Sequence, residues 1–158
     1  MSLITRTFVK VLPGSKAEPT LGSIWLDHQE RAVSLRRVRL ESGADAGLIL
    51  PRGTVLKDGD IVESRDGQTA RIKAAPEDLS LASCPDPLLL AKAAFVLGSR
   101  RVMAMVGLGT LAYPRDLGLD EMLKGLGLAI QHIRAPLHPE NGAYEHIKAQ
   151  AERSSLGD

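Results

Sequence analysis

Four histidines and one cysteine are the side chains of this 158-residue sequence best suited to bind a transition metal. Imidazole and thiolate donors suit such ions better than carboxylate or carbonyl oxygens do. They are spread along the chain as His28, Cys84, His132, His138 and His146. No HExxH pair occurs among them, so any metal site built from them depends on how the chain folds or associates.

Three of the histidines have a simpler interpretation than metal binding. His28 stands beside Asp27 and Glu30, which favours a local ion pair in a loop. His132 falls inside an expected strand, where a histidine on the sheet surface is the simplest interpretation. His138 precedes a proline and is expected in a loop.

His146 and Cys84 each keep two interpretations. His146 is either a metal ligand, with Glu140 and Glu145 as neighbouring oxygen donors, or a solvated tail residue. Cys84 precedes an expected helix, whose dipole favours a thiolate, but a small buried or half-buried hydrophobic residue is the simpler interpretation. No histidine pairs with a candidate nucleophile, and neither a P-loop nor a dinucleotide fingerprint occurs, so the sequence does not predict an enzyme.

The first half of the chain predicts a small all-β domain. Short apolar runs are separated by Gly, Pro and Asp at turn positions, beginning with a strand at 4–12. Within 32–40 the apolar residues change parity, which predicts a β-bulge near Arg36 and Arg37, because side chains alternate faces along a strand. Several short strands of this kind fit a sandwich or a barrel.

The second half predicts the order βαββαβ, with strands at 79–82, 102–106, 110–113 and 128–133. Asp86 is a suitable N-cap and Pro87 a suitable first residue for a helix that Gly98 would end in a left-handed conformation. Its apolar face is expected to consist of Leu88, Leu89, Ala91, Lys92, Phe95 and Val96. A second helix at 119–126 should end at Gly127, which completes a ferredoxin-like domain with both helices on one face of an antiparallel sheet.

The chain is therefore predicted to be α+β, with a β-rich domain at 1–75, a ferredoxin-like domain at 76–136 and a flexible tail at 137–158. A formal charge of +1 and 3% aromatic residues offer neither the field nor the stacking surface that nucleic acids need. The single cysteine excludes an intramolecular disulfide. No apolar run approaches the roughly 20 residues of a membrane span, so the cytoplasm is the expected compartment.

Several motifs resemble the UreE family of urease accessory proteins. The segments LDHQERAVSLRRVRL and DAGLILPRGTVLKDGDIV are similar to its amino-terminal domain, and DPLLLAKAAFVLGSRR and LAYPRDLGLDEML to its carboxy-terminal domain. GAYEH matches the point where metal-binding tails of the family begin, so the resemblance covers about residues 1–146. It implies a two-domain homodimer that carries nickel to urease together with a GTPase and other maturation proteins.

The resemblance also shows where metal ligands are missing. Family members usually have a histidine at the position of Arg101, and in their dimers the two copies of this histidine approach the two-fold axis and share one metal ion. Arginine has no lone pair to donate. Arg115 and Leu117 occupy positions where some members carry histidines, and the histidine-rich tail is reduced to His146.

Arg101 also changes the electrostatics expected at that axis. Two guanidinium groups roughly 4 Å apart repel by about 4 kcal/mol at an effective dielectric constant of about 20. They must splay, pair with carboxylates or hold an anion. Arg100, Arg101 and Arg115 are accordingly either a patch for phosphate or an acidic partner, or an ordinary set of solvated arginines.

The expected function is that of a UreE-type urease maturation factor that delivers nickel, with nickel (zinc in vitro) weakly bound or absent. The alternative is a metal-free dimeric adaptor that keeps the fold. Expected partners are a second copy, joined through apolar surface at Met103, Met105 and Leu108, urease apoprotein and the accessory GTPase, with no nucleic acid and no membrane. In the first domain, Arg52 is the candidate partner contact.

Overall fold

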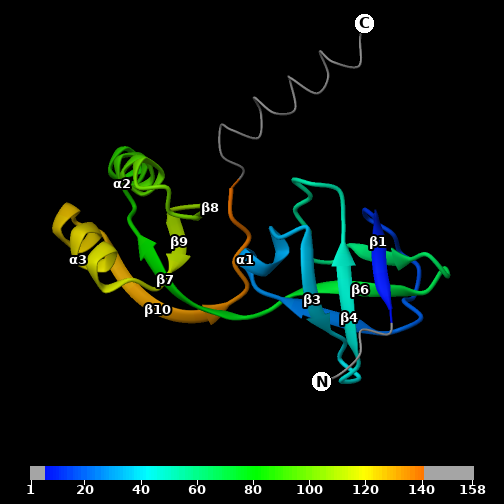
Figure 1. Cartoon of the computed structure of the whole chain (residues 1–158). Helices are drawn as coiled ribbons and strands as arrows, with labels where there is room; N and C mark the ends of the chain where they lie inside the picture. Colours follow the sequence, from blue (N-terminus) through cyan, green and yellow to red (C-terminus); the bar gives the residue numbers. More distant parts are fainter. Residues whose placement is uncertain (1–5, 141–158) are drawn as a thin grey trace, which may run out of the picture. The chain divides into compact units, whose positions relative to one another are not determined.

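The computed structural model describes residues 6–140, which divide into two compact units (Figure 1). The first unit comprises the described residues up to 78 together with 134–137, and the second comprises 79–133 with the described residues from 138. No helix within 6–140 is long and apolar enough to cross a membrane.

The first unit is built on one six-stranded sheet with a short helix. Its elements are β1 (Thr7–Leu12), β2 (Ser23–Leu26), α1 (His28–Arg31), β3 (Leu35–Arg39), β4 (Asp45–Ile49), β5 (Ile61–Ser64) and β6 (Thr69–Ala74). The strand order is β2-β6-β5-β1-β4-β3, in which β1–β4 and β2–β6 are the parallel pairs. Glu41 N, just after one edge strand, donates to Ser23 O on the other at 2.9 Å, so the sheet curls toward a barrel.

The parity change in β3 is not a bulge. Pairing with β4 runs without a shift from Leu35 opposite Ile49 to Arg39 opposite Asp45, so the prediction at Arg36 and Arg37 is wrong. Leu35 instead points outward and is 69% exposed, while Val38 packs in the core. The shift in this unit lies in β1, between Phe8 and Lys10.

The second unit has the predicted βαββαβ order. Its elements are β7 (Glu77–Ser83), α2 (Pro87–Ser99), β8 (Met105–Gly107), β9 (Thr110–Pro114), α3 (Leu117–Leu126) and β10 (Ala129–Ala135), with the outer ends of β7 and β10 belonging to the first unit. The strand order β10-β7-β9-β8 is ferredoxin-like, as expected. Both helices lie on one side of this sheet (Figure 1), and their buried residues share a core with β9.

The ends of the two helices follow the local signals except at one place. Asp86 caps α2 by accepting from Leu88 N at 3.0 Å, and Asp116 caps α3 by accepting from Leu119 N at 2.9 Å. Gly127 ends α3 with a φ of 105°, which favours glycine. The exception is the end of α2, which is described with the site below.

The buried face of α2 differs from the prediction. Ala93 and Leu97 are fully buried, whereas Leu88 and Phe95, both expected inside, are 64% and 77% exposed. Lys92 is the one charged residue within the helix, so α2 is apolar on nearly every side and its periodicity could not identify the buried face.

Candidate metal-handling site

Residue 101 lies in the turn that ends α2. Arg101 N donates to Gly98 O and Val102 N donates to Leu97 O, each at 3.0 Å, which is the Schellman pattern. Arg101 has a φ of 57° and is the one non-glycine residue within 6–140 with a positive φ. Gly98, predicted to take this conformation, lies inside the helix instead.

This conformation is unfavourable for arginine. The left-handed region costs most L-residues about 1–2 kcal/mol, whereas Asn, Asp and His are several-fold enriched there. The family resemblance implies a histidine at this position, so the backbone that holds Arg101 is one that a histidine tolerates better.

Replacing Arg101 with glycine should therefore stabilise the protein. We expect Arg101→Gly to raise the free energy of unfolding by about 0.5–1 kcal/mol, because relief of the left-handed strain exceeds the entropy that glycine adds to the unfolded chain. Arg100, with a φ of −92°, is the control, and Arg100→Gly should lower the same free energy. Urea denaturation measures both variants, and an equal loss of unfolding free energy in the two would show that the backbone at Arg101 is not strained.

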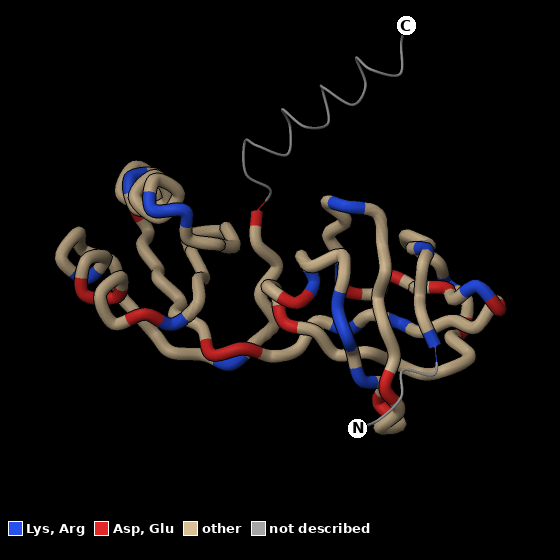
Figure 2. The backbone as a smooth tube through the Cα atoms, viewed as in Figure 1, with Lys and Arg blue, Asp and Glu red and all other residues tan. Residues whose placement is uncertain are grey.

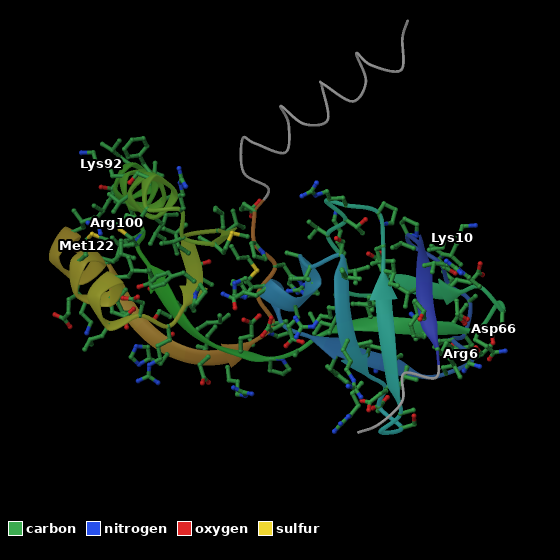
Figure 3. All side chains as sticks on the ribbon, viewed as in Figure 1. Arg6, Lys10, Asp66, Lys92, Arg100 and Met122 are labelled. Atoms are coloured by element: carbon green, nitrogen blue, oxygen red, sulfur yellow. The ribbon has the colours of Figure 1, made fainter. Side chains whose placement is uncertain are left out.

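The basic residues of the candidate site are exposed. Arg100, Arg101 and Arg115 all face solvent, and Leu117 at the start of α3 is 75% exposed. Among residues 6–140 no carboxylate forms an ion pair with any of these arginines, and no hydrogen bond joins Arg115 to the other two. Figure 3 shows Lys92 on α2 and Arg100 just after the end of this helix.

The other candidate ligands are dispersed within the described chain. Residues 6–140 contain no group of three or more His, Cys, Asp or Glu side chains that could hold a metal ion. His138 is exposed, and Cys84 is buried at 8% exposure, as a small hydrophobic residue would be. His146, the predicted ligand, lies outside the described residues.

His28 pairs with a distant carboxylate rather than a local one. Its Nδ1 lies 2.6 Å from Glu77 Oε1, and its main-chain N donates to Glu77 Oε2 at 3.0 Å. The predicted pair with Asp27 or Glu30 is wrong, because Asp27 caps α1 by accepting from Glu30 N at 2.7 Å.

The second unit contains a buried polar network that the sequence did not reveal. Asp120 on α3 is 1% exposed; it accepts from Tyr113 Oη at 2.7 Å, and its other oxygen lies 2.7 Å from His132 Nε2. Ser80 pairs directly with Tyr113 in the β7–β9 register and is fully buried. The bonds of Asp120 therefore join α3 to β9 and β10, and Ser80 lies beside them on β7.

The network favours the ionised form of Asp120. Burial alone would raise the pKa of Asp120, but the neighbouring Ser80 and the bonded side chains of His132 and Tyr113 lower it below the ordinary value. Ser80 itself makes no well-formed hydrogen bond among the described residues. Burial and the adjacent carboxylate raise the pKa of Tyr113, which keeps its hydroxyl a donor. His132 is thus a sheet-surface histidine bound to a carboxylate.

Glu140 covers the outer edge of β8. Its N donates to Ala104 O at 2.8 Å, and its Oε1 accepts from Val106 N at 3.2 Å. These bonds satisfy main-chain groups that an edge strand otherwise leaves unpaired. The chain is therefore fixed beside Ala104, three residues after Arg101, before it reaches His146.

Large apolar side chains are exposed on the second unit. They include Leu88, Phe95, Met103, Val106 and Leu108, of which Leu108 is fully exposed. Met105, predicted with Met103 and Leu108, is half-buried. Figure 2 shows few charged positions along α2 and β8, where most of this surface lies.

Arg52 occupies an exposed turn of the first unit. Thr54 N donates to Pro51 O at 3.1 Å, and Gly53 has a φ of 85°, so Arg52 is at the tip of a tight turn. No hydrogen bond or ion pair engages its side chain in the part of the chain that the structure describes.

Two family descriptions together cover nearly the whole chain. Residues 8–75 match "UreE urease accessory protein, N-terminal domain", and residues 77–156 match "UreE urease accessory protein, C-terminal domain".

Individual relatives agree with this match. The chain is 44% identical to a urease accessory protein UreE from Pseudomonas putida strain W619 over 131 residues, covering 82% of this chain and 81% of the relative. It is 48% identical over 121 residues to the UreE of Vibrio parahaemolyticus, covering 77% and 76%. It is 49% identical over 122 residues to that of Aliivibrio fischeri strain MJ11, covering 77% and 75%. The chain therefore belongs to the UreE family of urease accessory proteins.

Proposed function

We propose that this protein is a cytoplasmic homodimer that handles nickel as cargo during urease maturation, acting with urease apoprotein and its accessory GTPase and catalysing no reaction itself. The observation that carries the proposal is the turn at the end of α2, which presents residue 101 to solvent in a conformation suited to histidine. In this chain the residue is arginine, so the remaining metal affinity must come from other ligands.

The anchored start of the tail supports His146 as one such ligand. His146 follows Glu140 by six residues, so an extended chain reaches roughly 20 Å from Glu140. Glu140 is bonded to Ala104, three residues from Arg101, and the turn at residue 101 therefore falls within that reach.

Exposed apolar side chains support association of two copies through the second unit. Phe95 and Leu108 are 77% and 103% exposed. Monomeric proteins rarely leave contiguous apolar surface open, and such surfaces are commonly interfaces.

Calorimetric titration of the tag-free full-length chain with nickel, alongside sedimentation, tests the proposal. A dimer that does bind nickel, with at most one ion per dimer, supports a nickel carrier that has lost part of its ligand set. A dimer that binds no nickel and still binds the accessory GTPase supports the alternative, a metal-free adaptor. A monomer at tens of micromolar contradicts both.

Arg52 should contribute to partner binding through its charge. We expect Arg52→Glu to weaken binding of the accessory GTPase or apo-urease by about ten-fold, near 1.4 kcal/mol, without changing the unfolding transition. Arg65→Glu, at another exposed turn of the first unit, is the control of equal charge change. Binding of each variant to the immobilised partner measures both effects, and equal affinities of the Arg52→Glu and Arg65→Glu variants would show that the contact lies elsewhere.

A further inference from the structure

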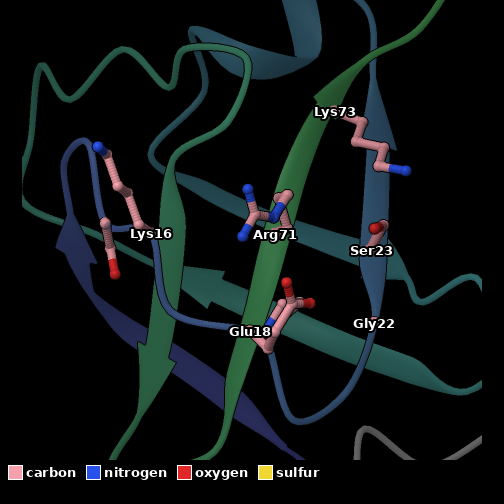
Figure 4. A pocket seen from close by; sticks show the side chains of 8 residues that line it. Lys16, Glu18, Gly22, Ser23, Arg71 and Lys73 are labelled. Atoms are coloured by element: carbon pink, nitrogen blue, oxygen red, sulfur yellow. The ribbon is translucent and has the colours of Figure 1, made fainter.

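An open hollow of about 650 Å³ lies on the outer face of β2 and β6, apart from every residue assigned above (Figure 4). The strands are parallel, with Ser23 opposite Arg71 and Trp25 opposite Lys73. The alternate residues Ile24 and Ile72 are buried, so these four side chains share the outer face. The floor of the hollow is thus a regular piece of sheet.

The wall of the hollow is the loop that precedes β2, and it is tied to β6. Leu21 N donates to Thr69 O at 2.9 Å, and Thr69 N donates to Thr20 Oγ1 at 2.8 Å. Arg71 Nη2 donates to Ala17 O at 2.9 Å, which fixes the loop from the other side. The hollow is therefore formed before any ligand arrives.

Positive charge dominates the lining. The lining contains three cationic side chains, Lys16, Arg71 and Lys73, and one carboxylate, that of Glu18 (Figure 4). None of the three cations forms an ion pair with a carboxylate within residues 6–140. Their charges are available to an incoming anionic group.

An aromatic ring adjoins the charges. Trp25 is 47% exposed, and Lys73 Nζ lies 5.0 Å from its ring centroid. This cation–π contact holds the lysine over the ring. Trp25 does not line the hollow itself, but its exposed ring surface beside Lys73 is open to an apolar side chain.

The spacing of the cations selects the ligand. Arg71 and Lys73 are two residues apart on one strand, so they are separated by roughly 6.6 Å along it. Alternate side chains of an extended peptide have the same separation. We propose that this hollow docks an extended acidic segment of a partner protein, with carboxylates at alternate positions and an apolar side chain against Trp25.

A synthetic peptide tests the docking site directly on the full chain. The probe is a fluorescein-labelled octapeptide that alternates Glu with Ala or Leu, followed by anisotropy at about 0.15 M salt, where distant charges are screened. The double variant Lys16→Glu and Lys73→Glu should weaken binding by about ten-fold or more. Lys10→Glu with Lys57→Glu, two exposed lysines outside the hollow, carries the same charge change and should stay within about two-fold.

Two further arms distinguish the ligand classes. A peptide of the same composition with its Glu residues in one block should bind more weakly, and inorganic phosphate at millimolar concentration should not compete. Failure of the alternating peptide to bind, equal binding of the block peptide, or competition by phosphate would each overturn the proposal. Nickel titration of the Lys16→Glu and Lys73→Glu double variant should match that of wild type. Failure of the docking proposal can therefore be told apart from failure of the proposed nickel role.

Discussion

Arg101→His should create a site for one nickel ion per dimer. If both copies of residue 101 meet at the dimer axis, the substitution removes two positive charges from the shared site and places two imidazoles there. Wild type should bind at least about ten-fold more weakly, a difference of about 1.4 kcal/mol, with the remaining affinity coming from His146. Calorimetric titration with nickel measures the difference.

The pH dependence of the Arg101→His site adds a second measurement. Metal binding needs neutral imidazole, and free imidazole has a pKa of about 6.5, so nickel affinity should fall below about pH 6. Arg100→His, one residue earlier in the same turn, is the matched control and should gain no comparable site. Tight nickel binding by wild type that Arg101→His leaves unchanged would place the metal site elsewhere.

Asp120→Ala should destabilise the second unit by about 3 kcal/mol. The change leaves the Tyr113 hydroxyl buried without its acceptor and removes the partner of His132. Glu121→Ala, at the next position on α3, removes an exposed carboxylate whose pair with Lys124 spans 3.4 Å and should cost no more than about 0.5 kcal/mol. Urea denaturation followed by circular dichroism compares the two.

Acid should remove the contribution of Asp120 in a defined direction. Because its pKa in the folded protein lies below the ordinary value, the carboxylate stabilises the fold fully above its unfolded pKa of about 3.9. That stabilisation is lost as pH falls through the folded pKa. The difference in unfolding free energy between wild type and Asp120→Asn should therefore shrink below about pH 4, and a constant difference would show that Asp120 does not titrate with folding.

Local signals predicted the second unit well because each is strong at short range. Asp86 and Pro87 start α2 and Gly127 ends α3 through bonds within a few residues, and these positions were confirmed. The prediction that Gly98 would end α2 was wrong, because packing overrode the preference of glycine for the left-handed position. Leu97 belongs to the core and Val102 packs against it, and joining them through a Schellman turn puts the left-handed position on Arg101.

The polar contacts of the site could not be predicted from spacing. His28 and Glu77 are 49 residues apart, and Glu140 meets Val106 across 34. No local pattern marks such pairs, since they follow from the strand order. The motif resemblance identified the family, whereas the contacts of Asp120 and Glu140 required the fold.

Leu137 determines what is lost when the protein is truncated between its two units. It is fully buried in the first unit, and its carbonyl accepts from Arg31, whose side chain is itself buried. A fragment ending at residue 75 lacks both the leucine and the acceptor, so it carries a cavity, and the Arg31 guanidinium keeps its bond to Asp27 O but loses the one to Leu137 O. The first unit is thus completed by residues that the ribosome adds after the whole second sheet, and its final packing must wait for them.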